Sequence, residues 1–150
     1  QIDFASYTEE TFPYNMRQPP SRGNALGLVK FMFPNRYNIY LHDTPSKSLF
    51  SRQTRAFSHG CIRLADPFDF AYELLKPQVG DPKTYFQSIL ATGNERRVDL
   101  KTPIPVHLIY RTAFTEADGT IRFRSDIYRR DAKIWRALAA EGVALRIGRG

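Results

Sequence analysis

The sequence predicts a mainly β fold with added helices, of the α+β class. Apolar and polar residues alternate over 37–42, which is typical of a strand, and a short apolar run over 26–33 predicts another strand. Two Asp-Pro pairs, at 66–67 and 81–82, are typical of helix starts, because a proline in the first helical turn loses no hydrogen bond and Asp66 is a plausible N-cap. The second of these helices is expected to stop at Gly93.

The two ends of the chain complete this prediction. Residues 1–24 are polar and proline-rich and predict an irregular lead-in. Strands are expected over 106–114 and 121–128, because the turn at 117–119 contains Asp-Gly, a hairpin signal. A last helix is expected from Asp131. A chain of 150 residues without repeats can bury one core, so residues 1–150 are predicted to form a single domain.

The charge of the chain favours an anionic partner but does not identify one. Lys and Arg number 22 against 15 Asp and Glu, a formal charge of +7. The basic residues are scattered, which is typical of a solvated surface. A basic module that binds cell wall or nucleic acid stays open as a non-enzymatic alternative, although no pattern of aromatic side chains interleaved with lysine on one sheet is evident. No apolar run reaches the ~18 residues of a membrane span.

The single cysteine carries the strongest functional signal. One cysteine excludes an internal disulfide and any zinc site with two cysteine ligands. Cys61 lies between His59 and Arg63, and His42 ends the strand predicted over 37–42, across the expected loop 43–57. Because the thiolate is the nucleophile, a reactive cysteine needs a base or a positive charge nearby. The pattern predicts a histidine-activated nucleophile for acyl transfer.

The residues just before the cysteine suggest an oxyanion hole. Gly60 would permit a tight or positive-φ turn that aims backbone N–H groups at one point. Two other interpretations use the same residue types: an inert buried cysteine, and a metal site built from His42, His59 and Cys61, for which no fourth ligand is evident. The signatures of papain-like proteases and of zinc deaminases are absent.

These residues resemble the catalytic motif of the L,D-transpeptidases of the YkuD type, H-x(14–17)-[ST]-H-G-C-x-[NR]. Here the motif runs from His42 through Ser58-His59-Gly60-Cys61 to Arg63. The runs 24–27 and 40–45 are similar to the large periplasmic branch of that family. The resemblance implies a β-sandwich of the L,D-transpeptidase type, with this chain as the C-terminal part of the catalytic domain. The N-terminal strands of the sandwich are expected to be missing, and residues 1–24 are a candidate lid.

The resemblance also implies an activity: peptidoglycan cross-linking in the periplasm or cell envelope, for cell wall biogenesis and cell shape. Cys61 would form an acyl-enzyme with a tetrapeptide stem, His42 would be its base, and the product would be a 3→3 cross-link. L,D-carboxypeptidase, lipoprotein-attaching and lipoprotein-cleaving activities stay open as alternatives. Carbapenems would be acylating inhibitors, and neither metal, cofactor nor nucleic acid is implied. Gly60 and His59 are expected to form the oxyanion turn. The residues expected to contact the substrate are Arg63, Tyr40 and Ser58.

Overall fold

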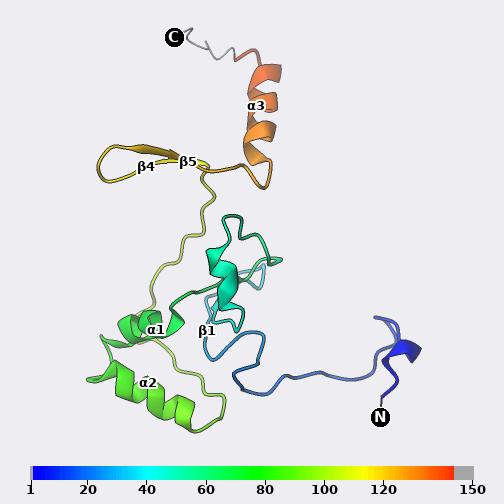
Figure 1. Ribbon diagram of the computed structural model, residues 1–150, viewed down its shortest axis with the longest axis vertical. Coiled ribbons are helices and arrows are strands. Elements are labelled where there is room, and N and C mark those ends of the chain that lie inside the picture. The colour runs from blue at the N-terminus through cyan, green and yellow to red at the C-terminus, as the bar shows by residue number, and fades with distance from the viewer. Residues whose placement is uncertain (1, 144–150) are drawn as a thin grey trace. The chain divides into compact units, whose positions relative to one another are not determined.

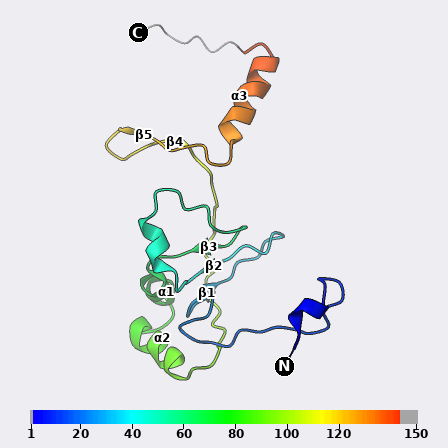
Figure 2. The same cartoon turned by 45° about the vertical axis from the view of Figure 1, so that its right-hand side comes forward.

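The computed structural model describes residues 2–143, which fall into two compact units (Figures 1 and 2). Residue 1 of the predicted lead-in and residues 144–150 of the predicted domain lie outside this range. Within it, the first unit comprises 2–51 and 58–103, and the second comprises 52–57 and 104–143. The first unit contains η1 (Phe4–Ser6), β1 (Lys30–Phe31), β2 (Leu41–His42), η2 (Lys47–Ser51), β3 (Ile62–Arg63), α1 (Pro67–Leu75) and α2 (Pro82–Ala91). The second contains β4 (Ala113–Thr115), β5 (Ile121–Phe123) and α3 (Arg130–Ala140).

The first unit is organised around a mixed three-stranded sheet with β2 in the centre. β1 runs antiparallel to β2, with Lys30 opposite His42, and β3 runs parallel to β2, with His42 opposite Arg63. Because side chains alternate along a strand, Lys30, His42 and Arg63 share one face of the sheet. The opposite face carries Phe31, whose ring packs on Phe70 of α1 with 4.9 Å between centroids. One face of this sheet therefore meets helix α1, and the other carries the polar residues.

Helices α1 and α2 form the small core of the first unit. Ala71, Leu75 and Phe86 are its buried members, and the rings of Phe68 and Phe86 lie 5.2 Å apart. The predicted helices are thereby confirmed, and α2 is followed by Gly93 in a positive-φ conformation, as expected. Asp66 occupies the N-cap position of α1 as predicted, but its side chain makes no capping hydrogen bond.

The strands of the first unit are shorter than predicted. Instead of 26–33, only Lys30–Phe31 pairs, because Gly27 turns the chain with φ +66°. Instead of 37–42, only Leu41–His42 pairs, because Asn38 adopts φ 52°. The side chain of Asn35 stabilises that turn by accepting hydrogen bonds from the backbone N–H groups of residues 37 and 39, both at 3.0 Å.

The second unit is a hairpin followed by a helix. β4 and β5 pair antiparallel around a turn in which Gly119 donates to Glu116 at 3.0 Å, which confirms the predicted hairpin although the paired segments are shorter than 106–114 and 121–128. The strand prediction fails near Asp126 because its carboxylate is engaged as a helix cap, accepting from the backbone N–H of Arg130 at 2.9 Å. The two sheets and three α-helices found in residues 2–143 give the α+β class. No helix in the described part of the chain is long and apolar enough to cross a membrane.

Candidate functional site

Parallel pairing of β2 and β3 brings the histidine and cysteine segments of the motif together. The N–H of Ile62 donates to the carbonyl of Tyr40 at 3.0 Å, and the N–H of Leu64 donates to the carbonyl of His42 at 2.9 Å. Cys61 immediately precedes β3, so the alternation of β3 places it on the same side as Arg63 and His42. Two segments that are separated by residues 43–57, which include η2, thus meet on neighbouring strands.

His42 is held in one tautomer by the chain itself. Its side chain is buried, with 4% of the residue exposed. Its Nδ1 contacts the backbone carbonyl oxygen of Asp43, and since a carbonyl can only accept, Nδ1 must carry the proton. A neutral imidazole in this state leaves the lone pair of Nε2 free to accept a proton. An imidazole in this state can accept a proton through Nε2.

Tyr40 is a neighbour of both Cys61 and His42. The pKa of the Tyr40 hydroxyl is raised, first because it hydrogen-bonds the thiol of Cys61, and further by burial and by the nearby negative charge that Cys61 can carry. The Tyr40 ring also packs edge-on against His42, with centroids 5.8 Å apart, and the Lys30 Nζ lies 3.7 Å above its centre. The thiol itself lies 3.9 Å from the carbonyl oxygen of Asn38. Among the described residues, no hydrogen bond joins Cys61 directly to His42.

Of the tight or positive-φ turn expected at Gly60, the structure does not show the positive φ. The turn is closed by Ser58, whose Oγ accepts from the Gly60 N–H at 3.2 Å. Ser58, His59 and Gly60 are all exposed, and Cys61 is half-buried. The N–H of Cys61 has no hydrogen-bond partner among residues 2–143, so it is free to donate to a bound ligand.

Arg63 lies opposite His42 in the register of β2 and β3. It is half-buried and forms no ion pair with any carboxylate in residues 2–143. An unpaired guanidinium on the face that carries His42 can receive a carboxylate in a bidentate arrangement. Within the same described range, no group of three or more His, Cys, Asp or Glu side chains is arranged to hold a metal ion.

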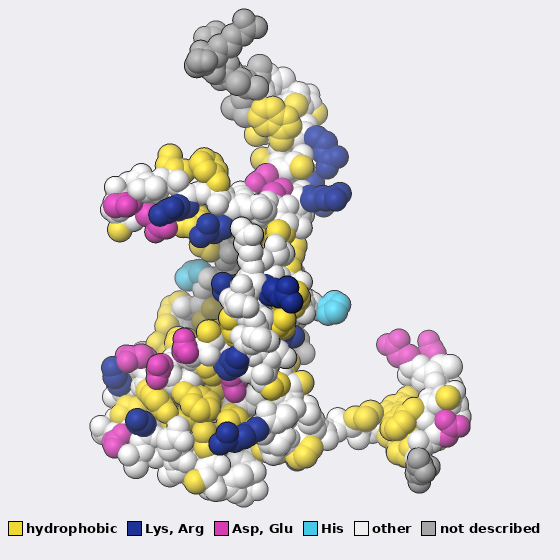
Figure 3. Space-filling view, viewed as in Figure 1, with side chains coloured by type: hydrophobic (Ala, Val, Ile, Leu, Met, Phe, Trp, Pro, Cys, Tyr) yellow, Lys and Arg dark blue, Asp and Glu magenta, His cyan; other side chains and the backbone are white. Residues whose placement is uncertain are grey.

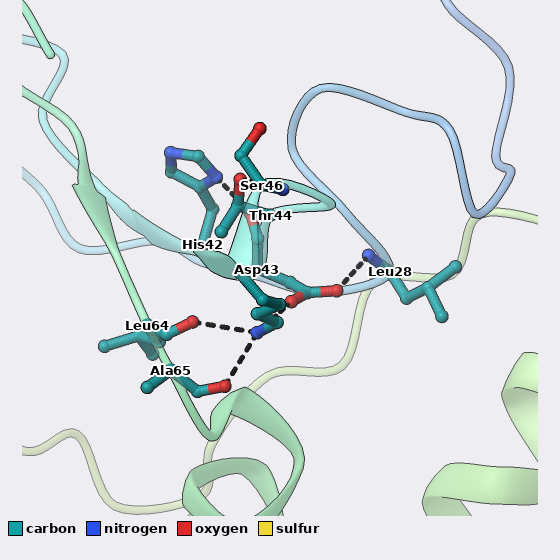
Figure 4. A network of polar contacts seen from close by, with 8 residues as sticks. Leu28, His42, Asp43, Thr44, Ser46, Leu64 and Ala65 are labelled. Carbon is teal, nitrogen blue, oxygen red and sulfur yellow. Dashed lines mark hydrogen bonds and ion pairs between the residues drawn. The ribbon is translucent and has the colours of Figure 1, made fainter. Parts of the chain in front are cut away.

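Sequence reasoning missed the residues behind His42, shown in Figure 4. Asp43 is buried, accepts from the N–H of Leu28 at 2.9 Å, and pairs with Lys47 at 2.7 Å. Lys47 also donates to the carbonyls of Leu64 and Ala65, at 3.0 and 2.7 Å. A charged residue directly after a strand is common at surfaces, so no sequence signal indicated that this one is buried.

Basic side chains do not gather into a stripe on the face shown in Figure 3. There, Lys and Arg lie dispersed among acidic and hydrophobic side chains. Such a distribution is typical of a solvated surface. The candidate site residues of the first unit lie instead on the sheet face that carries His42 and Arg63.

Comparison with known proteins identifies the family that the motif resembles. The YkuD family, described as the L,D-transpeptidase catalytic domain, matches residues 3–106, which include His42 and Cys61. A protein of Haemophilus influenzae named "Putative L,D-transpeptidase" is 39% identical over 133 residues. That alignment covers 89% of this chain but only 26% of the relative, so the chain spans about a quarter of that protein's length. The chain belongs to the YkuD family of L,D-transpeptidase catalytic domains.

Proposed function

We propose that this chain carries the active centre of a peptidoglycan L,D-transpeptidase that forms 3→3 cross-links through an acyl-enzyme on Cys61. The observation that supports this best is the state of His42. It is buried, protonated at Nδ1, and lies on the same sheet face as the segment that leads from Cys61 into β3. A base with an available Nε2 on the same sheet face as a single thiol favours cysteine acyl transfer.

In the first half-reaction, the Sγ of Cys61 attacks the carbonyl carbon of the third residue of a tetrapeptide stem, at the L-centre of diaminopimelate. The thiol proton passes to Nε2 of His42, and the carbonyl π electrons move to oxygen. When the tetrahedral intermediate collapses, the C–N bond breaks, the proton moves from His42 to the leaving amine, and D-alanine departs. The stem is left as a thioester on Cys61.

Backbone N–H groups are proposed to stabilise the oxyanion of that intermediate. The N–H of Cys61 has no partner among the described residues, and the N–H of Gly60 is held by an exposed hydroxyl, that of Ser58. A substrate oxygen could displace this hydroxyl at little cost, because Ser58 can hydrogen-bond water instead. His59, exposed in the same turn, is proposed to shape the turn rather than to be the base.

In the second half-reaction, a side-chain amine of another stem attacks the thioester. Its proton passes to His42, the C–S bond breaks, and the thiolate of Cys61 is regenerated and takes the proton back. Water in place of the amine would give a carboxypeptidase, and other amines would give the lipoprotein-attaching variant. Arg63 and Tyr40 are proposed to bind the donor stem, Arg63 through a carboxylate. The substrate implies the periplasm or cell envelope as the location, and carbapenems would acylate the same thiol.

Mass spectrometry of purified muropeptides tests the reaction. With disaccharide-tetrapeptide as substrate, the protein should yield a dimer that has lost one D-alanine, and Cys61→Ala should yield none. A tripeptide monomer as the only product would assign carboxypeptidase activity and overturn the cross-linking proposal. Product formed equally by Cys61→Ala would remove Cys61 as the nucleophile.

A further inference from the structure

The mechanism above uses the backbone carbonyl of Asp43 but not its side chain, which is the unusual group in this region. The carboxylate has only 10% of its surface exposed. Burying a charge is costly unless it is paired and hydrogen-bonded, so a buried carboxylate on a short loop requires a reason. Burial alone would raise the pKa of Asp43, but the ammonium of Lys47 and the N–H groups of Leu28 and Thr44 outweigh it and hold that pKa below its ordinary value.

These contacts determine which way the neighbouring peptide group points. The N–H of Asp43 donates to the carbonyl of Val29 on one side at 2.9 Å, and the carboxylate binds Leu28 and Lys47 on the other. The Thr44 N–H lies close enough to the Asp43 carboxylate to help lower its pKa. In a trans peptide the N–H and C=O groups point in opposite directions, so this contact turns the Asp43 carbonyl away from the carboxylate. That carbonyl receives Nδ1–H of His42.

The backbone around the carboxylate is shaped to accept it. Gly27 has φ +66°, and a Cβ atom at this position would overlap the side chain of Asp43. Lys47, on η2, reaches past Asp43 to the carbonyls of Leu64 and Ala65, directly after β3. The ammonium thereby ties the segment that carries His42 to the strand that follows Cys61.

We propose that Asp43 and Lys47 are positioning residues that fix the orientation of the Asp43 carbonyl and thereby keep His42 in the Nδ1–H tautomer. Neither side chain touches the substrate. The effect of this pair on turnover rests on the proposed function, because it operates through His42 as the base. The effect of this pair on the tautomer of His42 is independent of the proposed function.

Nitrogen-15 NMR of histidine-labelled protein reads the tautomer directly. At about pH 8.5 free imidazoles are neutral, and His42→Gln identifies the His42 signals by their loss. The wild type should show a protonated Nδ1 and an unprotonated Nε2. Lys47→Met and Asp43→Asn should shift population toward Nε2–H, whereas Lys47→Arg, which keeps the charge, should stay close to wild type. The matched control is Lys76→Met, which removes another lysine–carboxylate pair, Lys76–Glu73, outside this network.

Single-turnover acylation by a carbapenem supplies the second measurement. Histidines bound to metals lose roughly 10–100-fold in function when their outer hydrogen-bond partner is removed, and we expect a similar fall in acylation rate for Lys47→Met and Asp43→Asn. A His42 tautomer that is unchanged in both variants overturns the proposal, whatever the rate. A tautomer that shifts while acylation stays at the wild-type rate upholds the positioning role and contradicts the assignment of His42 as base. A wild type that is not acylated at all contradicts the proposed function alone.

Discussion

Replacing Gly27 with alanine tests how tightly the backbone fits around Asp43. Two costs add in this variant. Alanine at φ +66° pays the penalty of the left-handed region, about 1–2 kcal/mol. Its Cβ would also overlap the Asp43 side chain, and relieving such overpacking typically costs about 1–3 kcal/mol. The total loss of stability should therefore be roughly 2–5 kcal/mol.

The chain provides a matched control in Gly93. Its φ is +67°, nearly that of Gly27, but a Cβ atom there would meet nothing within 4 Å. Gly93→Ala should thus cost only the backbone term, about 1–2 kcal/mol. Urea unfolding of both variants, followed by circular dichroism, gives the two free energies, and their difference isolates the contact with Asp43. Equal destabilisation by the two substitutions would refute the reasoning, because it would mean that the space beside Gly27 is not restricted.

Four further predictions concern the proposed chemistry and its support. Intact-mass analysis should find one carbapenem adduct on the wild type and none on Cys61→Ala; an adduct on the variant would place the nucleophile elsewhere. In single-turnover acylation, His42→Ala should lose the ~10²–10⁴-fold typical of a general base and His59→Ala should lose less, an order whose reversal would exchange their roles. Arg63→Lys should lower muropeptide turnover while thermal unfolding changes little; parallel loss of both would make Arg63 structural. Because the pKa of Asp43 is lowered on folding, its carboxylate stabilises the fold above the ordinary pKa near 3.8, and this stabilisation is lost as pH falls through the lower folded value. The difference in free energy of unfolding between wild type and Asp43→Asn should therefore narrow in acid. A difference that stayed constant would contradict the stabilising role of the Asp43 carboxylate.

The helices were predictable because their signals are local. Proline at the first position and glycine after the last are read from a few adjacent residues, and Pro67, Pro82 and Gly93 occupy these positions in the structure. Even here a local signal failed once. Asp66 occupies the N-cap position of α1, with φ −118° and ψ 67°, yet its side chain makes no capping hydrogen bond.

The strands were less predictable because pairing is a property of two segments. Alternation over 37–42 identified the strand but not its length, since the turn at Asn38 depends on hydrogen bonds from the side chain of Asn35. β3 was not predicted at all. Its two residues, Ile62 and Arg63, are too few to show a period, and they become a strand only because β2 lies beside them.

The candidate site shows the same division between local and non-local information. The motif was evident in the sequence because its residues carry distinctive chemistry at a distinctive spacing. The meeting of Lys47 with Asp43 and with the carbonyls after β3 depends on the folded chain. A lysine in a loop otherwise predicts only a solvated charge.

Alternation along β2 explains why Asp43 supports His42 through its backbone. Successive side chains of a strand point to opposite faces, so the imidazole of His42 and the carboxylate of the next residue diverge. The imidazole lies on the face of Tyr40 and Arg63, whereas the carboxylate turns toward Leu28 and Lys47. A direct carboxylate–imidazole pair is therefore excluded by the strand geometry, and the carbonyl of Asp43 is the group left to receive Nδ1–H. Shifting the pairing by one residue would exchange the two faces and separate the base from the cysteine, so the register of β2 with β3 is itself a requirement of the proposed chemistry.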